Sequence, residues 1–357
     1  MKRKGITPSY YKNFLCKGSE CSENCCIGWK IEIDVESLER YAKVGGELGD
    51  ELCENIIRDG ESSHFCLKNG RCAFLDENNL CRLISSFGED ILCDICREHP
   101  RFYINFPKGG FLGVGLCCEA AAELVLSEKN PVGYGLCRPE IMRAALSFVD
   151  RDGEIYDADI YQQSLESLKK IEQTLSAGAD PVAACELILD SSRSLQAKID
   201  ESLYGIASDI LPDGGPSDGN RLLGNFILRL SELEYLTDEI RRRLSRVNIR
   251  DAAEFYKSNP EFLGYLGRCI IYFADRYLPG VPEDMDSTGR GNLVLSLSLV
   301  LCLLLTTVDE VTVAAAQKIC TLVSRELEYN EDNAELLREF DSLAMVEIVK
   351  MLGLGNL

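Results

Sequence analysis

Cysteine is the residue type in this chain whose number and spacing could do chemistry. Thirteen of the 17 cysteines lie before residue 140, and Cys16, Cys21, Cys25 and Cys26 all fall within the first 26 residues. A chain of 357 residues does not need disulfides to complete its core. An odd number of densely spaced cysteines in a reducing compartment is typical of metal binding or catalysis. The sequence therefore predicts a metal-binding region in its N-terminal part.

Five further cysteines complete the candidate ligand set. Cys72 and Cys81 lie at the ends of CAFLDENNLC, which we expect to form a β-hairpin around the turn DENN. Cys93 and Cys96 have the spacing at which two thiolates reach one metal ion. Cys118 directly precedes a predicted helix, and a helix N-terminus stabilises a thiolate. The predicted metal ligands are Cys16, Cys21, Cys25, Cys26, Cys72, Cys81, Cys93, Cys96 and Cys118.

The spacing leaves the kind of metal open. Structural zinc needs four ligands, usually from two CxxC-like pairs, and the chain has only two histidines to contribute. A 4Fe-4S cluster takes four thiolates from looser spacings, which suits C-x4-C-x3-C-C better. His99, beside the cysteine pair in CREHPRF, could orient a metal ligand through a hydrogen bond or simply be a packed or exposed side chain. For His64 we favour a role without metal.

Length and composition indicate two domains, which divide near residues 129–139. We expect an irregular cysteine-rich metal domain with short β-hairpins in residues 1–135 and an α-helical bundle in residues 136–357, so the fold class is mainly α. Apolar residues recur at helical spacing in residues 140–150, 161–175, 181–203, 221–244, 252–277, 293–308, 311–329 and 333–352. Four cysteines in these helices are expected to be small buried side chains: Cys185, Cys269, Cys302 and Cys320.

Short sequence patterns predict individual strands and helices around the cysteines. Residues 30–34 alternate as a short strand does, and Asp34 is a plausible N-cap for the helix that follows. RFYINF and GGFLGVG read as two strands joined by a turn, and the glycines of the second favour close packing over a nucleotide-binding loop. The apolar residues 293–308 are too few for a transmembrane helix, so we expect a buried one.

Charge limits the kinds of partner. The net charge is −20, and most of it lies in residues 141–357, which argues against nucleic acid because phosphate binding needs Lys and Arg. The acidic surface could attract a lysine-bearing protein or serve only solubility. The start MKRKGITPSYYKNF lacks the apolar segment of a signal peptide or membrane anchor, so we expect a cytoplasmic protein.

The cysteine-containing segments also carry a family resemblance. TPSYYKNFLCKGSECSENCCIGWKIEID and CAFLDENNLCRLISSFGEDILCDICREHPRF, with the later CC pair, resemble the flagellin lysine-N-methylase family, within a larger cysteine-rich CxxCxxCC metal-chelating family. The resemblance implies a lysine N-methyltransferase that transfers methyl groups from S-adenosylmethionine to flagellin and carries a 4Fe-4S cluster, with zinc as the alternative. The family's eight recurring cysteines map onto every candidate ligand except Cys93. The sequence does not divide them between one metal site and two.

Two motifs of S-adenosylmethionine enzymes are missing from the sequence. Cys21 and Cys25 are followed directly by Cys26, which breaks the radical-enzyme spacing C-x3-C-x2-C, and no G-x-G-x-x-G loop occurs. The methyl-donor site and the catalytic residues therefore stay unassigned.

Methylation still sets a chemical demand. Lysine attacks as the neutral amine, and because its ordinary pKa is about 10.4, the site needs a base or a carboxylate. Tyr10, Tyr11, Trp29 and Tyr103 could line such a slot, although a core position is favoured for each. Alternative functions are a non-enzymatic zinc- or iron-binding interaction protein and a redox sensor that uses its vicinal cysteine pairs. The oligomeric state stays open.

Overall fold

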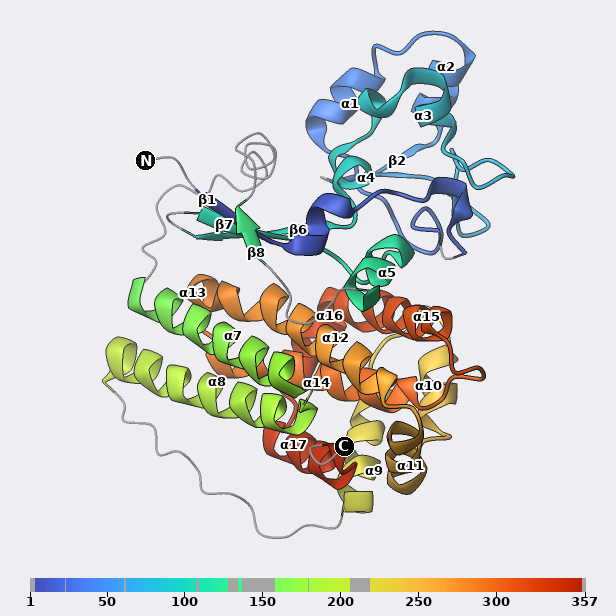
Figure 1. The fold of residues 1–357 in the computed structure, drawn as a ribbon. Coiled ribbons are helices and arrows are strands. Elements are labelled where there is room, and N and C mark those ends of the chain that lie inside the picture. The colour runs from blue at the N-terminus through green and yellow to red at the C-terminus, as the bar shows by residue number, and fades with distance from the viewer. Residues whose placement is uncertain are drawn as a thin grey trace.

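The computed structural model describes residues 4–22, 24–60, 62–106, 109–127, 134–136, 158–178, 180–205 and 219–354. In Figure 1 the cysteine-rich lobe, residues 16–98 in blue to cyan, lies above a small β-sheet, and the helices in green to red lie below it. The expected mainly α fold class is confirmed, whereas the metal-binding character of the N-terminal part stays a prediction.

Short elements around a small core of their own build the cysteine-rich lobe. Buried side chains of that core include Ile31, Tyr41 and Phe65. Asp34 caps the first helix as expected, because its carboxylate accepts a hydrogen bond from the Ser37 amide at 2.8 Å. The elements are α1 (Val35–Tyr41), α2 (Glu47–Glu54), β2 (Ile56–Asp59), β3 (Ser62–Phe65), β4 (Leu67–Lys68), β5 (Arg71–Cys72), α3 (Arg82–Phe87) and α4 (Asp94–Glu98).

Two local expectations for this lobe are wrong. The hairpin is formed by β4 and β5, and the segment that follows Cys72 is a loop closed by a single bridge between Leu75 and Cys81. The Asp76 carboxylate accepts hydrogen bonds from two amides of this loop and so competes with strand pairing. The expected strand at residues 30–34 is reduced to one bridge between Glu32 and His64.

A four-stranded sheet joins the lobe to the helices, in the order β6 (Arg101–Phe106), β7 (Gly109–Val114), β1 (Lys4–Pro8), β8 (Tyr134–Leu136). The expected pairing of RFYINF with GGFLGV is confirmed, but β1, which runs parallel to β7, was not predicted. A Cβ atom on Gly113 would lie 2.2 Å from the Phe102 ring, so the close packing expected of these glycines is confirmed.

Helices make up the rest of the described chain. They are α5 (Glu119–Ser127), α7 (Ala158–Gly178), α8 (Pro181–Tyr204), α9 (Gly219–Ser231), α10 (Glu239–Leu244), α11 (Ile249–Ser258), α12 (Glu261–Tyr277), α13 (Val281–Asp284), α14 (Ser287–Leu305), α15 (Val313–Val323), α16 (Glu331–Arg338) and α17 (Ser342–Met351). Three expected helices, at residues 221–244, 252–277 and 333–352, are each broken into two. Pro260 explains one break, since it lacks an amide donor, and Asp341 explains another by capping α17. The expected helix at residues 140–150 and most of the loop at 211–220 lie outside the described residues.

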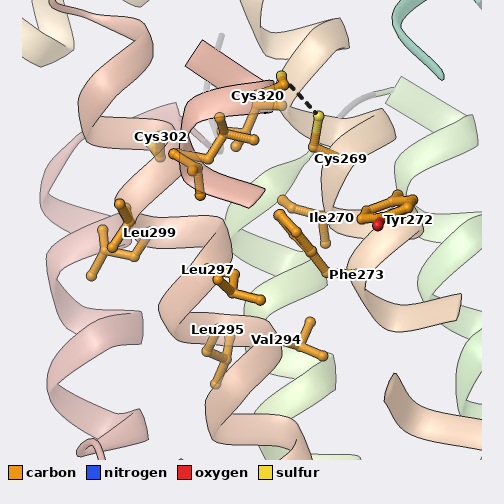
Figure 2. Close-up of a cluster of buried hydrophobic side chains, with 14 of the residues drawn as sticks. Cys269, Ile270, Tyr272, Phe273, Val294, Leu295, Leu297, Leu299, Cys302 and Cys320 are labelled. Carbon is orange, nitrogen blue, oxygen red and sulfur yellow. Dashed lines mark hydrogen bonds between the residues drawn. The ribbon is translucent and has the colours of Figure 1, made fainter. Parts of the chain in front are cut away.

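Helix α14 is the buried centre of the helical part. It packs against α8, α12, α15, α16 and α17, and Figure 2 shows side chains of α12 and α14 gathered in this core. It is long and apolar enough to cross a membrane, but 89% of its apolar window is buried inside the protein, as expected for a core helix. The four cysteines expected to be buried here are buried, and Cys269 Sγ lies 3.7 Å from Cys320 Sγ.

The core of the helices continues into the sheet. Tyr10, Tyr11, Leu112 and Val125 pack in the same apolar cluster as α12 and α14, whereas the core of the cysteine-rich lobe is separate. Tyr10 and Tyr11 are thus core residues. The domain boundary expected at residue 135 adjoins residues outside the described ranges and stays a prediction.

We expect Leu299→Ala to lower the free energy of unfolding by about 2–5 kcal/mol, because it empties a fully buried position at the centre of α14. Urea denaturation followed by circular dichroism measures the loss. Leu228→Ala is the matched control, because Leu228 is 63% exposed on α9, and it should change stability by less than about 0.5 kcal/mol. Equal losses in the two variants would contradict the central place of α14.

Candidate functional site

Nine predicted ligands fall into two neighbouring thiol groups. The first, which we call the outer group, contains Cys16, Cys21, Cys25 and Cys118. Burial and the charges of Cys118, Cys16 and Cys25 raise the pKa of Cys21 to about 12. Ser22 donates hydrogen bonds to the Glu119 carboxylate at 2.8 and 2.7 Å, which ties this loop to the start of α5. The expected placement of Cys118 immediately before a helix is confirmed.

The inner group lies in the core of the cysteine-rich lobe and contains Cys26, Cys72, Cys81, Cys93 and Cys96. Burial and neighbouring thiols, among them Cys81 and Cys93, raise the pKa of Cys72 to about 11. A hydrogen bond from Cys96 lowers the pKa of Cys93, and the same contact raises the pKa of Cys96. Cys93 sits at the N-cap of α4, so the CxxC pair lies at the start of a helix.

Cys25 and Cys26 join the two groups. The Cys26 thiol donates a hydrogen bond to Cys25, and this bond, together with the weaker effect of the Arg325 guanidinium, lowers the pKa of Cys25 to about 7. The same hydrogen bond and burial raise the pKa of Cys26. Cys25 is therefore the thiol of this pair that ionises first.

The thiols are close but do not converge on one point. In the part of the chain described here, no group of three or more His, Cys, Asp or Glu side chains is arranged so that it could hold a metal ion. The assignment of these cysteines as metal ligands thus stays a prediction.

A cavity of about 160 Å³ opens beside Cys25, where the cysteine-rich lobe meets the helices. We call it the junction cavity. Arg325 bridges the two parts, because it donates a hydrogen bond to the Ile27 carbonyl at 3.0 Å. The cavity is lined by Cys25, Trp29, His99, Cys117, Leu236, Arg325, Tyr329 and Asn330.

His99 lies in this cavity as a neutral imidazole. Its ring packs against Trp29 at 5.3 Å and Tyr329 at 6.3 Å between centroids, and its Nε2 is 4.0 Å from Cys117 Sγ. Burial, followed by the positive charges of Arg325 and Arg276, lowers the pKa of His99 to about 4. The aromatic faces of this cavity suit a flat group, and the Arg325 guanidinium suits an anion. The same guanidinium repels a second cation.

A buried ion pair holds the far wall of the junction cavity. Arg276 Nε lies 2.9 Å from Glu328 Oε1, and Arg276 Nη1 donates to the Tyr329 hydroxyl at 3.0 Å. A Cβ atom on Gly115 would lie 2.0 Å from that hydroxyl, so only glycine leaves room for Tyr329 here. The ion pair and this glycine together fix the ring that faces His99.

The sequence singled out Cys25, Trp29 and His99 but did not predict that they would share a cavity with residues of the helices. Trp29 and His99 line it, whereas Tyr103 donates a hydrogen bond to Glu98 at 2.6 Å outside it. For Arg325 and Tyr329 the sequence pattern predicts only a helix with an apolar face, and no role in a site. A turn of π-helix, Ser324–Glu328, follows α15, and such turns often occur at functional sites, but no sequence pattern reveals one.

The lowered pKa of His99 predicts acid sensitivity. A histidine that folds as the neutral imidazole contributes stability above pH 6.5, and this contribution is lost as the pH falls toward 4. We expect the free energy of unfolding to fall by about 3 kcal/mol more in the wild type than in His99→Gln between pH 7 and pH 4. Urea denaturation at a series of pH values measures the free energy of unfolding of both proteins. The titration of other groups contributes equally to the two proteins and cancels when one curve is subtracted from the other. Parallel curves for the two proteins would contradict the prediction.

Comparison with known proteins adds a distant relationship. The chain is 29% identical over 143 residues to the flagellar biosynthetic protein FliU of Salmonella muenchen, an alignment that covers 38% of this chain and 85% of FliU. Lysine-N-methylases of Salmonella choleraesuis and Salmonella typhimurium are each 26% identical over 138 residues, which is 36% of this chain and 34% of each relative. No family model and no solved structure matches. The chain is thus distantly related to FliU and to lysine-N-methylases over little more than a third of its own length.

Proposed function

We propose that this protein is a protein-lysine N-methyltransferase that uses S-adenosylmethionine and acts on flagellin. The observation that carries the proposal is the similarity to two proteins named lysine-N-methylase, supported by the flagellar name of the third relative. The matched segment spans about a third of each methylase, so activity and substrate are proposed for the whole chain rather than transferred to it.

We further propose that cysteines of the outer or the inner group bind one 4Fe-4S cluster. Each group contains at least the four cysteines that one cluster takes, and thiolates are the ligands of iron–sulfur clusters. The thiols do not converge in this structure, so the proposal requires them to move together when the cluster assembles. When bound, the cluster would supply an iron centre and a covalent tie within a lobe that has little regular structure.

The junction cavity is poorly suited to the substrate lysine. The Arg325 guanidinium in its lining repels a lysine ammonium, and no carboxylate occurs among the described residues that line it. We therefore place the acceptor amine elsewhere on the molecule.

The proposal is tested by iron, acid-labile sulfide and zinc analysis of protein purified without oxygen, followed by a methylation assay. About four iron and four sulfide per chain are expected for one cluster. Flagellin incubated with the protein and S-adenosylmethionine should gain methyl groups on lysine, as measured by mass spectrometry. Stoichiometric zinc without sulfide, or no methyl transfer by the iron-loaded protein, would contradict the respective part of the proposal.

Cys25→Ser combined with Cys26→Ser should lose most of the bound iron and the methylation activity, because it removes one thiol from each group. Cys53→Ser is the matched control, since Cys53 is exposed on α2 and belongs to neither group. It should keep both properties. An iron-free double variant that still methylates flagellin would rule out a role for the cluster in the reaction.

A further inference from the structure

A second cavity, of about 210 Å³, lies between the sheet and the helices α7 and α12. Its apolar walls include Ile6, Phe111, Leu165 and Leu168. Its polar groups are Tyr134 from β8, Glu172 and Lys169 from α7, and Asp275 from α12. We call this cavity the acid slot, because two carboxyl groups and one phenol meet in it.

Asp275 is an unusual residue to find buried in the last turn of a core helix. Only 3% of its surface is exposed, and burial, followed by the negative charge of Glu172, raises its pKa well above the ordinary value. The Tyr134 hydroxyl donates a hydrogen bond to Asp275 Oδ2 at 2.8 Å. Buried carboxylates are normally compensated by a cation, and none contributes to the shift of Asp275.

Glu172, on the facing helix α7, is a second carboxyl group in the slot whose pKa is raised. Burial raises its pKa, and a hydrogen bond from Tyr134 opposes the shift. No basic side chain contributes there either, although Lys169 stands at the rim, where it is exposed. Two carboxyl groups thus share one phenol, and among the described residues none places a positive charge between them inside the slot.

We propose that the acid slot binds the side chain of a substrate lysine, with Asp275 and Glu172 facing its ammonium group. The apolar walls match the four methylenes of lysine, and the ammonium has three hydrogen bonds to donate to two carboxyl groups. This inference rests on the proposed methyltransferase function and assigns the acceptor site that the junction cavity does not provide.

Asp275 also supplies the base that the reaction needs. The bound ammonium gives one proton to the Asp275 carboxylate and becomes a neutral amine. Its nitrogen lone pair then forms the N–CH₃ bond while the S–CH₃ bond of S-adenosylmethionine breaks. The electron pair of the broken bond stays on sulfur, so the thioether S-adenosylhomocysteine leaves. The proton on Asp275 then passes to water.

The binding step can be tested without any methyl donor. We expect n-butylammonium, the end of a lysine side chain, to bind the full-length protein saturably in ligand-observed NMR at neutral pH. Asp275→Asn should weaken this binding at least about tenfold, because the charged hydrogen-bond partner is gone. Equal binding to wild type and Asp275→Asn, or equal binding of neutral 1-pentanol to the wild type, would overturn the proposal.

Asp275→Asn is well suited to this test, because asparagine has the shape of the protonated acid and can still accept the Tyr134 hydrogen bond. Its thermal unfolding should therefore stay close to that of the wild type. Glu172→Gln should also weaken amine binding. Matched controls are Asp190→Asn and Glu166→Gln, which change exposed carboxylates on α8 and α7 outside the slot and should leave amine binding unchanged.

The methylation assay separates this inference from the proposed function. If the wild type methylates flagellin, Asp275→Asn should lower kcat at least about a hundredfold, by loss of the base. An Asp275→Asn variant that methylates at the wild-type rate would overturn the acid slot and leave the methylase function standing. A wild type that binds n-butylammonium through Asp275 but methylates nothing would refute the methylase function and leave amine binding standing.

Discussion

Burial of α12 between the sheet and α14 is the constraint on which the rest of the structure depends. An interior helix must satisfy its polar side chains inside the protein, because water does not reach them. Tyr272 and Arg276 meet this requirement through the Glu328 carboxylate. Asp275, which precedes Arg276, has the Tyr134 hydroxyl as its partner and no cation among the described side chains around it. One helix thus carries a completed buried ion pair and, beside it, an acid whose charge is not compensated.

The two cavities differ in the sign of charge that they accept. The junction cavity combines Arg325 with a neutral histidine and aromatic rings beside Cys25, whereas the acid slot combines two carboxyl groups with an apolar wall. Phe102 and Phe111 stack across adjacent strands, and Phe102 also meets Arg276 and Tyr272. This pair of rings therefore has Arg276 next to Phe102 and the two carboxyl groups of the acid slot next to Phe111.

Local patterns predicted local structure well. The Asp34 cap, the start of α5 after Cys118 and the buried α14 all depend on neighbours within a few residues, so the sequence contains the whole signal. The break between α9 and α10 depends instead on a residue far away in the sequence. Glu326, some ninety positions later, accepts hydrogen bonds from the amides of Leu236 and Thr237. The junction cavity and the acid slot were missed for the same reason. Each combines side chains from segments far apart in the chain, and Asp275 sits in a stretch that reads as apolar helix.

Strand β1 gives the molecule a particular order of assembly. Residues 4–8 pair with β7 and β8, so the first strand made has to wait until more than a hundred further residues are available. Closing such a long loop is slow compared with forming helices, because the chain loses conformational entropy before the strands form stabilising hydrogen bonds. During that interval the thiols between residues 16 and 118 remain accessible on an open chain. If the cysteines hold the proposed cluster, its insertion competes with sheet closure in the newly made protein, and the order matters most for Cys72 and Cys93, which are buried once the chain has folded.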